Sequence, residues 1–160
     1  AGVRNGVMAH SYSSLGIQRV VMNGKEVGEI ETRSALAGAF NVPVIFLSGD
    51  KAAAEDLLAI VPDAETAVVK EGIGYYACLS LTMLEAEKLI EAKAEAAMKK
   101  VSSIRPYKVE GPVEFLTEYS TRSTLFPDAV LPAGVERVAP RTLRFRGANY
   151  LEAWTRWAGR

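Results

Sequence analysis

The chain has 160 residues, of which 49% are hydrophobic and 24% are charged, and its 19 acidic and 19 basic side chains leave no net charge. This balance argues against a dedicated nucleic-acid binder and gives no electrostatic reason to dock on an anionic membrane. A chain of this length can bury a sizeable core as one domain or as two small ones. No apolar run approaches the roughly 18 residues that a membrane span needs.

The start of the chain and its single cysteine bear on where the protein works. The first residues, AGVRNGV, contain no initiator Met and no visible signal peptide, so we expect translation to have begun before Ala1. Cys78 cannot form an internal disulfide, and its apolar neighbours favour a buried free thiol over a reactive one. A free thiol fits a reducing compartment.

A β-hairpin is predicted for residues 17–29. Asn23-Gly24 separates two β-rich runs there and suits a type I′ turn, in which both central residues need positive φ. The two-residue loop predicts three cross-strand pairs: Met22 with Lys25, Val20 with Val27, and Gln18 with Glu29.

The only histidine, His10, precedes this hairpin, and Glu29 ends it directly after a glycine. Glu29 would project from a largely apolar strand face, where a carboxylate is costly unless a partner satisfies it. We therefore interpret His10 and Glu29 as the part of an active site that this chain carries. The alternative is a helix N-terminal glutamate, which the helix dipole favours, and the sequence leaves both open. The Ser-rich run after His10 is expected to form turn hydrogen bonds.

A β-α-β unit is predicted next. Its parts are a helix over 30–40, an apolar strand over 44–47, a helix over 51–61 and a strand over 66–69. Strands joined in this way are parallel, and ligands bind beyond their carboxyl ends. Asp50 and Lys70 are therefore candidates for the rim of the site, with a helix-capping Asp and a solvated Lys as the alternatives.

The middle of the chain predicts a long helix. Residues 72–76 are Gly-rich but lack the pattern of a phosphate loop. Thr82 begins the helix with Glu85 as its capping-box partner, and Glu95 with Lys99 makes a favourable i,i+4 pair. The predicted buried stripe is Met83, Ala86, Ile90, Ala94, Ala97 and Val101.

The last third predicts a strand over 113–119, a strand over 135–146 interrupted by Pro140, and a helix over 149–158. Three arginines on the second strand are interpreted as a solvated face, with a nucleic-acid patch as the alternative: Arg141, Arg144 and Arg146. The last helix carries an apolar stripe, interpreted as core or a subunit contact: Tyr150, Leu151, Trp154, Trp157 and Ala158.

These elements predict an α/β fold class: the C-terminal half of a three-layer α/β/α domain, followed by a small α+β two-layer sandwich. We expect residues 1–80 to belong to the α/β catalytic domain, whose N-terminal half is missing from this chain. Residues 81–160 are expected to form the small α+β domain.

Five motifs in a fixed order carry a resemblance to a known family. They are HSYSS from His10, NGKEVGE at 23–29, ALAGAFNVPV at 35–44, LSGD at 47–50 and AVVK at 67–70. Together they resemble the zinc-dependent D-aminopeptidase family of the dipeptide-transport-operon type, and the resemblance covers essentially the whole chain. It corresponds to the C-terminal portion of a family member only.

The resemblance implies a binuclear zinc aminopeptidase, with two Zn²⁺ ions per complete site, that releases N-terminal D-amino acids such as D-Ala from short peptides. It implies a cytoplasmic homo-oligomeric ring, a decamer, with no nucleic-acid or membrane partner. By position, Glu29 matches a zinc-ligating glutamate and His10 a catalytic histidine. The remaining ligands precede Ala1 in the family pattern, so a missing N-terminal polypeptide is an expected partner.

The sequence alone does not supply a two-metal site, because zinc needs at least three protein ligands and Glu29 offers one. The family usually has Asn at the position of Arg33, which is expected to repel zinc, bind a substrate carboxylate or point away. Arg33 and Asp50 are the candidate substrate-binding residues. The leading hypothesis is an aminopeptidase subunit or fragment that acts by zinc-activated water attack. The alternative is a non-catalytic oligomerising scaffold without a complete metal site.

Overall fold

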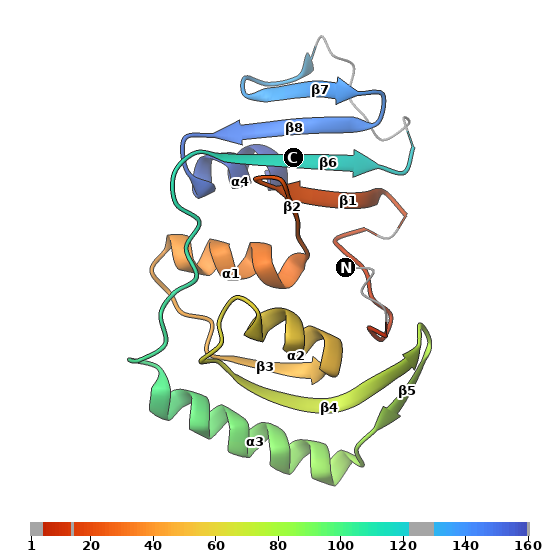
Figure 1. Ribbon diagram of the computed structural model, residues 1–160, viewed down its shortest axis with the longest axis vertical. Helices are drawn as coiled ribbons and strands as arrows, with labels where there is room; N and C mark the ends of the chain where they lie inside the picture. Colours follow the sequence, from red (N-terminus) through yellow and green to blue (C-terminus); the bar gives the residue numbers. More distant parts are fainter. Residues whose placement is uncertain (1–4, 14, 122–129, 160) are drawn as a thin grey trace. The chain divides into compact units, whose positions relative to one another are not determined.

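The structure is a computed structural model of the chain, and it describes residues 5–13, 15–121 and 130–159. The described residues form two sheets with helices packed on them, so the predicted α/β class is confirmed (Figure 1). Contacts divide the chain into two units: His10–Ala39 with Lys108–Arg160, and Gly2–Ala9 with Phe40–Tyr107. These units do not follow the expected boundary at residues 80 and 81, and that division into a catalytic and a smaller domain stays a prediction. No helix among the described residues is long and apolar enough to cross a membrane.

The first unit contains a five-stranded antiparallel sheet in the order β2-β1-β6-β8-β7. Its strands are β1 (Ile17–Met22), β2 (Lys25–Glu26), β6 (Val113–Tyr119), β7 (Val135–Ala139) and β8 (Thr142–Gly147). β1 pairs with β6 as well as with β2, which joins the early hairpin to strands nearly a hundred residues later. This long-range pairing is the reason why the early hairpin belongs to the same unit as the C-terminal strands.

The predicted hairpin turn is confirmed. Met22 pairs with Lys25, and Asn23 and Gly24 have φ values of 48° and 84°, as a type I′ turn requires. The predicted pair of Gln18 with Glu29 is wrong, because β2 ends at Glu26 and Glu29 begins α1 (Glu29–Ala39).

The predicted single strand over 135–146 is also wrong, since the chain turns back near Pro140 and forms two paired strands, β7 and β8. Proline has no N–H to give to a ladder and a fixed φ, which suits the end of a strand better than its middle.

One face of this sheet forms the core of the first unit. Val113, Phe115 and Thr117 alternate along β6 and are buried, which confirms the predicted half-buried strand. α4 (Tyr150–Ala158) packs on β6 and β8, and α1 packs on α4. Of the predicted α4 stripe, Tyr150 and Trp157 are buried, Leu151 and Trp154 are half-buried, and Ala158 is exposed.

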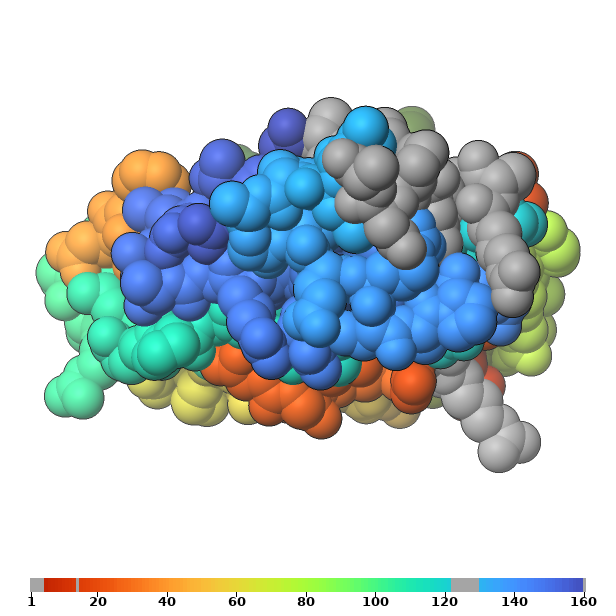
Figure 2. Space-filling model, turned by 90° about the horizontal axis from the view of Figure 1, so that it is seen from above, coloured from red at the N-terminus to blue at the C-terminus, as the bar shows by residue number. Residues whose placement is uncertain are grey.

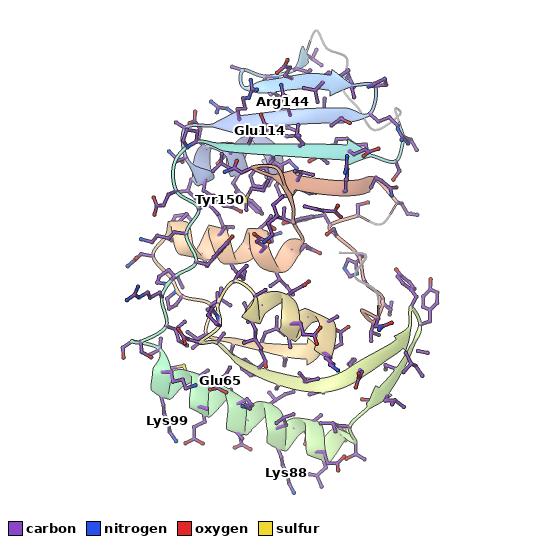
Figure 3. All side chains as sticks on the ribbon, viewed as in Figure 1. Glu65, Lys88, Lys99, Glu114, Arg144 and Tyr150 are labelled. Carbon is purple, nitrogen blue, oxygen red and sulfur yellow. The ribbon has the colours of Figure 1, made fainter. Side chains whose placement is uncertain are left out.

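The opposite face of the sheet is covered with ion pairs. Glu114 on β6 forms an ion pair with Arg144 of β8 at 3.1 Å and accepts a hydrogen bond from Arg146 of β8 at 3.0 Å. Figure 3 shows Glu114 and Arg144 on these neighbouring strands. Arg141 pairs with Glu118 at 3.4 Å. The three arginines therefore meet glutamates of adjacent strands, as in a solvated sheet face. The edge strand β7 and its neighbour β8, both blue, lie at the surface in Figure 2.

The second unit contains a three-stranded sheet in the order β3-β4-β5. Its elements are β3 (Phe46–Asp50), α2 (Lys51–Leu58), β4 (Glu65–Gly74), β5 (Ala77–Ser80) and α3 (Met83–Lys100). β3 and β4 are parallel and α2 connects them, as predicted, while β5 is an antiparallel addition that the sequence analysis missed. Figure 1 shows α2 and α3 on opposite sides of β3 and β4. Cys78 on β5 is a free thiol, as expected, but half-buried rather than buried.

The Gly-rich run at 72–76 closes the β4–β5 hairpin and receives the N-terminal segment. The amide of Met8 donates to the carbonyl of Tyr75 at 2.8 Å. A Cβ on Gly72 would lie 2.0 Å from the carbonyl oxygen of Asn5. Gly72 is therefore needed for the close approach of two backbones, which accounts for a glycine here without a phosphate loop.

The predicted N-terminal cap of helix α3 is confirmed, whereas most of its predicted buried apolar stripe is wrong. Thr82 and Glu85 form the capping box, and Lys99 pairs with Glu95 at 2.6 Å. Lys88 and Lys99 point away from the sheet (Figure 3). Of the six predicted buried positions only Ala97 is fully buried, and Met83 is 79% exposed. The helix packs mainly on β4 and to a smaller extent on β3, and the N-terminal end of its apolar stripe stays exposed.

Glu65 anchors α3 to the sheet and gives the second unit a pH dependence. Its carboxylate accepts from Lys93 at 2.9 Å and from Lys100, and these hydrogen bonds lower the pKa of Glu65 from 4.5 to about 2. A depressed carboxyl pKa contributes stability that is fully present above pH 4.5 and is lost as pH falls toward 2.

We therefore expect Glu65→Gln to lower stability at pH 7 and to flatten the fall in thermal midpoint between pH 4.5 and 2. Circular dichroism melts at both pH values measure this. Glu71→Gln is the matched control, because Glu71 forms an exposed pair with Lys51 and such pairs contribute little. Equal pH profiles for Glu65→Gln and the wild type would contradict the assignment.

Candidate functional site

The structure brings His10 and Glu29 together, as the sequence analysis expected. Nε2 of His10 lies 4.0 Å from Oε2 of Glu29, and the two side chains are 59% and 37% exposed. This distance is longer than a hydrogen bond between those two atoms. Both residues belong to the first unit, so their proximity is a property of one compact body.

Glu29 owes its place to the start of α1. Gly28 lies between the hairpin and α1. Glu29 and Glu31 are acidic residues in the first turn of this helix, where the helix dipole favours them. The carboxylate also accepts a hydrogen bond from the backbone N–H of Tyr12, at 3.2 Å. The two interpretations of Glu29 are therefore compatible, because the residue is N-terminal in the helix and also faces His10.

Tyr12 connects the parts of this site. Its hydroxyl hydrogen-bonds Oγ1 of Thr32 at 2.5 Å, and its ring meets the edge of Trp157 with centroids 4.8 Å apart. Burial raises the pKa of the Tyr12 phenol, against the lowering effects of Thr32 and of the Arg33 charge, so the hydroxyl stays protonated at neutral pH. Its φ of 55° is unusual for a residue other than glycine, and such conformations concentrate at functional sites.

Arg33 extends the site along α1. It is exposed, and its guanidinium carbon lies 5.6 Å from the ring centroid of Tyr12 and 5.0 Å from that of Trp154. Both distances are within the range of cation–π attraction. Arg33 therefore borders the same Tyr12 that holds Glu29.

Asp50 has a structural task in the second unit. One carboxylate oxygen caps α2 through the amide of Ala53 at 2.8 Å, and the other accepts from the amide of Val7 at 2.7 Å. The helix-capping alternative is thus shown, and Asp50 also fixes the segment that leads to His10. A contact of Asp50 with substrate stays a prediction, as does a rim position for Lys70.

The described residues do not amount to a complete zinc site. Residues 5–13, 15–121 and 130–159 contain no group of three or more His, Cys, Asp or Glu side chains placed to hold a metal ion. Protein zinc sites use at least three such ligands. His10 and Glu29 therefore fit as part of a donor set, and the other donors would have to come from elsewhere. The Oγ of Ser11, next to His10 in the chain, is buried and has no hydrogen-bond partner among the described residues.

Sequence reasoning missed Tyr12, Thr32 and the two tryptophans as parts of this site. Tyr12 stood in a Ser-rich run that indicated only turn hydrogen bonds, and Ser13 does make one with the amide of Gly16. The sequence predicts the tryptophans to be core or a subunit contact, but nothing local links them to residues more than a hundred positions earlier. An aromatic residue two positions after the only histidine was the available signal.

The chain is similar to known proteins over nearly its whole length. A family model described as D-aminopeptidase matches residues 1–158. The D-aminopeptidase of Bacillus subtilis (strain 168) is 26% identical over 149 residues, which cover 93% of this chain and 54% of that protein.

The structure of the Zn-dependent D-aminopeptidase DppA from Bacillus subtilis, described as a self-compartmentalizing protease, superposes with a TM-score of 0.85 at 25% identity. That match covers 99% of this chain and 58% of the other, so the chain spans little more than half the length of these relatives. Because the family match runs over nearly every residue, the chain belongs to the D-aminopeptidase family.

Proposed function

We propose that this chain is a subunit or fragment of a metal-dependent aminopeptidase that releases N-terminal D-amino acids, D-Ala in particular, from short peptides. The observation that carries the proposal is the meeting of His10 and Glu29 at 4.0 Å in a chain of the D-aminopeptidase family. An imidazole and a carboxylate at this separation suit a shared site better than a structural pair, since both side chains are partly exposed.

In this proposal Glu29 is a zinc ligand and His10 the general acid or base. Two bound zinc ions would supply an activated water and a polarised scissile carbonyl. The Tyr12 amide, bonded to one oxygen of Glu29, orients that carboxylate. His10 would move a proton at the reacting group, and the exposed position of its imidazole beside Glu29 supports this role.

The remaining donors would come from a polypeptide outside the described residues, and the orphaned Ser11 hydroxyl supports a missing neighbour. We further propose a homo-oligomeric ring, a decamer, as the working form, because the DppA neighbour is described as self-compartmentalizing. Exposed apolar side chains of β4, of β5, of the turn between them and of α3 offer surface for such contacts: Ile73, Tyr76, Leu79 and Met83. The single free Cys78 fits the reducing cytoplasm.

A non-catalytic oligomerising scaffold is the second candidate, favoured by the incomplete donor set among the described residues. One preparation separates the two. The protein is purified with every polypeptide that accompanies it, and its intact mass, zinc content and hydrolysis of D-Ala–D-Ala and L-Ala–L-Ala are measured.

A second polypeptide, zinc and faster cleavage of the D-peptide are the results expected for the enzyme. A single 17.3 kDa species without zinc and without activity would establish the scaffold instead.

A further inference from the structure

Arg33 and Glu29 share one face of α1. They are four residues apart, so their Cβ atoms lie about 5–6 Å apart on the same side of the helix. Tyr12 touches both residues, through its amide at Glu29 and its ring at Arg33. A small molecule that reaches Glu29 therefore comes within reach of the Arg33 guanidinium.

The Arg33 guanidinium is exposed and lies against two aromatic rings. Cation–π contacts with Tyr12 and Trp154 position the group, and such contacts do not need its N–H donors as hydrogen bonds do. No carboxylate among the described residues forms an ion pair with Arg33. Arg144 and Arg146 of the same unit, by contrast, both pair with Glu114. Arg33 is thus a fixed cation beside the candidate site, with donors that no carboxylate of the described chain occupies.

We propose that Arg33 binds the terminal carboxylate of the substrate and thereby makes dipeptides the preferred substrate class. The inference rests on the function proposed above. In a dipeptide the scissile carbonyl and the terminal carboxylate are separated by one residue, about 3.8 Å. Both groups can therefore lie within reach of neighbouring side chains on one helix face. A longer peptide places a neutral amide opposite the guanidinium and loses a charge-assisted, bidentate contact.

The test compares D-Ala–D-Ala with D-alanyl-D-alaninamide, which lacks only the terminal charge, in the zinc-loaded protein with its accompanying polypeptides. Wild type is expected to have a KM at least about 10-fold lower for the free carboxylate, the usual effect of losing a charged hydrogen bond. Arg33→Gln is expected to raise the dipeptide KM by about 10- to 100-fold and to change the amide KM by less than about 3-fold. Arg33→Lys keeps the charge but lacks the paired N–H donors of the guanidinium. Its dipeptide KM is expected to lie between those of the wild type and Arg33→Gln.

Arg19→Gln is the matched control, because Arg19 is an exposed arginine of the same unit that pairs with Glu118 at 3.1 Å. It should leave both KM values unchanged. A second measurement follows tryptophan fluorescence as D-Ala–D-Ala is added, since Trp154 lies against Arg33. Wild type should respond to the dipeptide and not to the amide, and Arg33→Gln should respond to neither.

The outcomes separate the two levels of the proposal. Cleavage of both substrates, with Arg33→Gln raising both KM values equally or neither, overturns the role of Arg33 and leaves the peptidase standing. No cleavage of either substrate by a zinc-loaded wild type overturns the proposed function, and the role of Arg33 with it.

Discussion

Glu29→Gln is expected to remove zinc binding and peptide hydrolysis while leaving the fold intact. The amide keeps the shape of the side chain and can still accept the Tyr12 N–H, but it is a far weaker zinc ligand than a carboxylate. Loss of an outer-shell partner typically costs about 10- to 100-fold in metal affinity or activity, so loss of a direct ligand should cost at least about 100-fold. Zinc content by elemental analysis and kcat/KM on D-Ala–D-Ala measure both effects.

Glu31→Gln is the matched control for this substitution. Glu31 also lies in the first turn of α1, where its carboxylate pairs with Lys25 at 2.9 Å. Both variants lose one charge near the same helix N-terminus, worth about 0.3–1 kcal/mol of stability, so their thermal midpoints should shift alike. Only Glu29→Gln should lose zinc and activity. Full zinc content and activity in Glu29→Gln would contradict the assignment.

His10→Ala should behave differently from Glu29→Gln. A general acid or base contributes about 100- to 10,000-fold to rate, so kcat should fall by that order while zinc is retained. Wild-type kcat in His10→Ala would exclude a proton-transfer role for the imidazole. A parallel loss of zinc would instead make His10 a ligand, and comparing the two variants assigns each side chain.

The local features of this fold could be predicted from the sequence, because short-range signals control them. Asn23-Gly24 determines the turn since only residues that tolerate positive φ fit it, and Thr82 with Glu85 determines the start of α3. Asp50 was recognised as a candidate cap for the same reason. In each case the interacting groups lie within about four residues of one another.

The long-range features could not be predicted in this way. The pairing of β1 with β6 depends on matching faces of strands far apart in the chain, and many other pairings have the same apolar pattern. This pairing makes the β1–β2 hairpin part of the first unit. Met83 was predicted to be buried but is exposed. An apolar stripe on a helix is buried only where another element covers it, and the sequence does not show which element that is.

The site was predicted in part for the same physical reason. The sequence singles out His10 because it is the only histidine, and both His10 and Glu29 because they match positions of the family pattern. Tyr12 was not, because its role depends on an unusual φ and on Trp157, which lies on a helix at the other end of the chain. Sequence patterns indicate which side chains are reactive, whereas packing determines which residues position those side chains.

Trp157→Ala is expected to lower the stability of the fold far more than Glu29→Gln does. The indole is 7% exposed and stacks on Phe115 with centroids 4.9 Å apart. Its N–H donates to Oγ1 of Thr117 at 2.6 Å. Truncating a buried aromatic side chain to Ala typically costs about 3–5 kcal/mol, because both transfer energy and packing are lost. For a chain of this size the thermal midpoint should fall by about 6–20 °C, measured by circular dichroism.

Two milder variants separate the ring from its hydrogen bond. Trp157→Phe retains a stacked ring and should cost less than Trp157→Ala, whereas Thr117→Val leaves the indole N–H buried without an acceptor, at about 1–3 kcal/mol. Thermal midpoints of Trp157→Ala and wild type within about 2 °C, on the order of half a kcal/mol, would contradict a core role for this residue.

Trp157→Ala should also weaken the candidate site. The indole makes a T-shaped contact with the ring of Tyr12, and the Tyr12 amide donates a hydrogen bond to Glu29. At a temperature where the variant is still folded, zinc affinity should therefore fall together with activity. Thr117→Val destabilises the same core but keeps the indole against Tyr12, so it should lose stability without losing zinc. If Trp157→Ala and Thr117→Val both lose zinc affinity, each in proportion to its loss of stability, the contact of Trp157 with Tyr12 has no separate effect on Glu29.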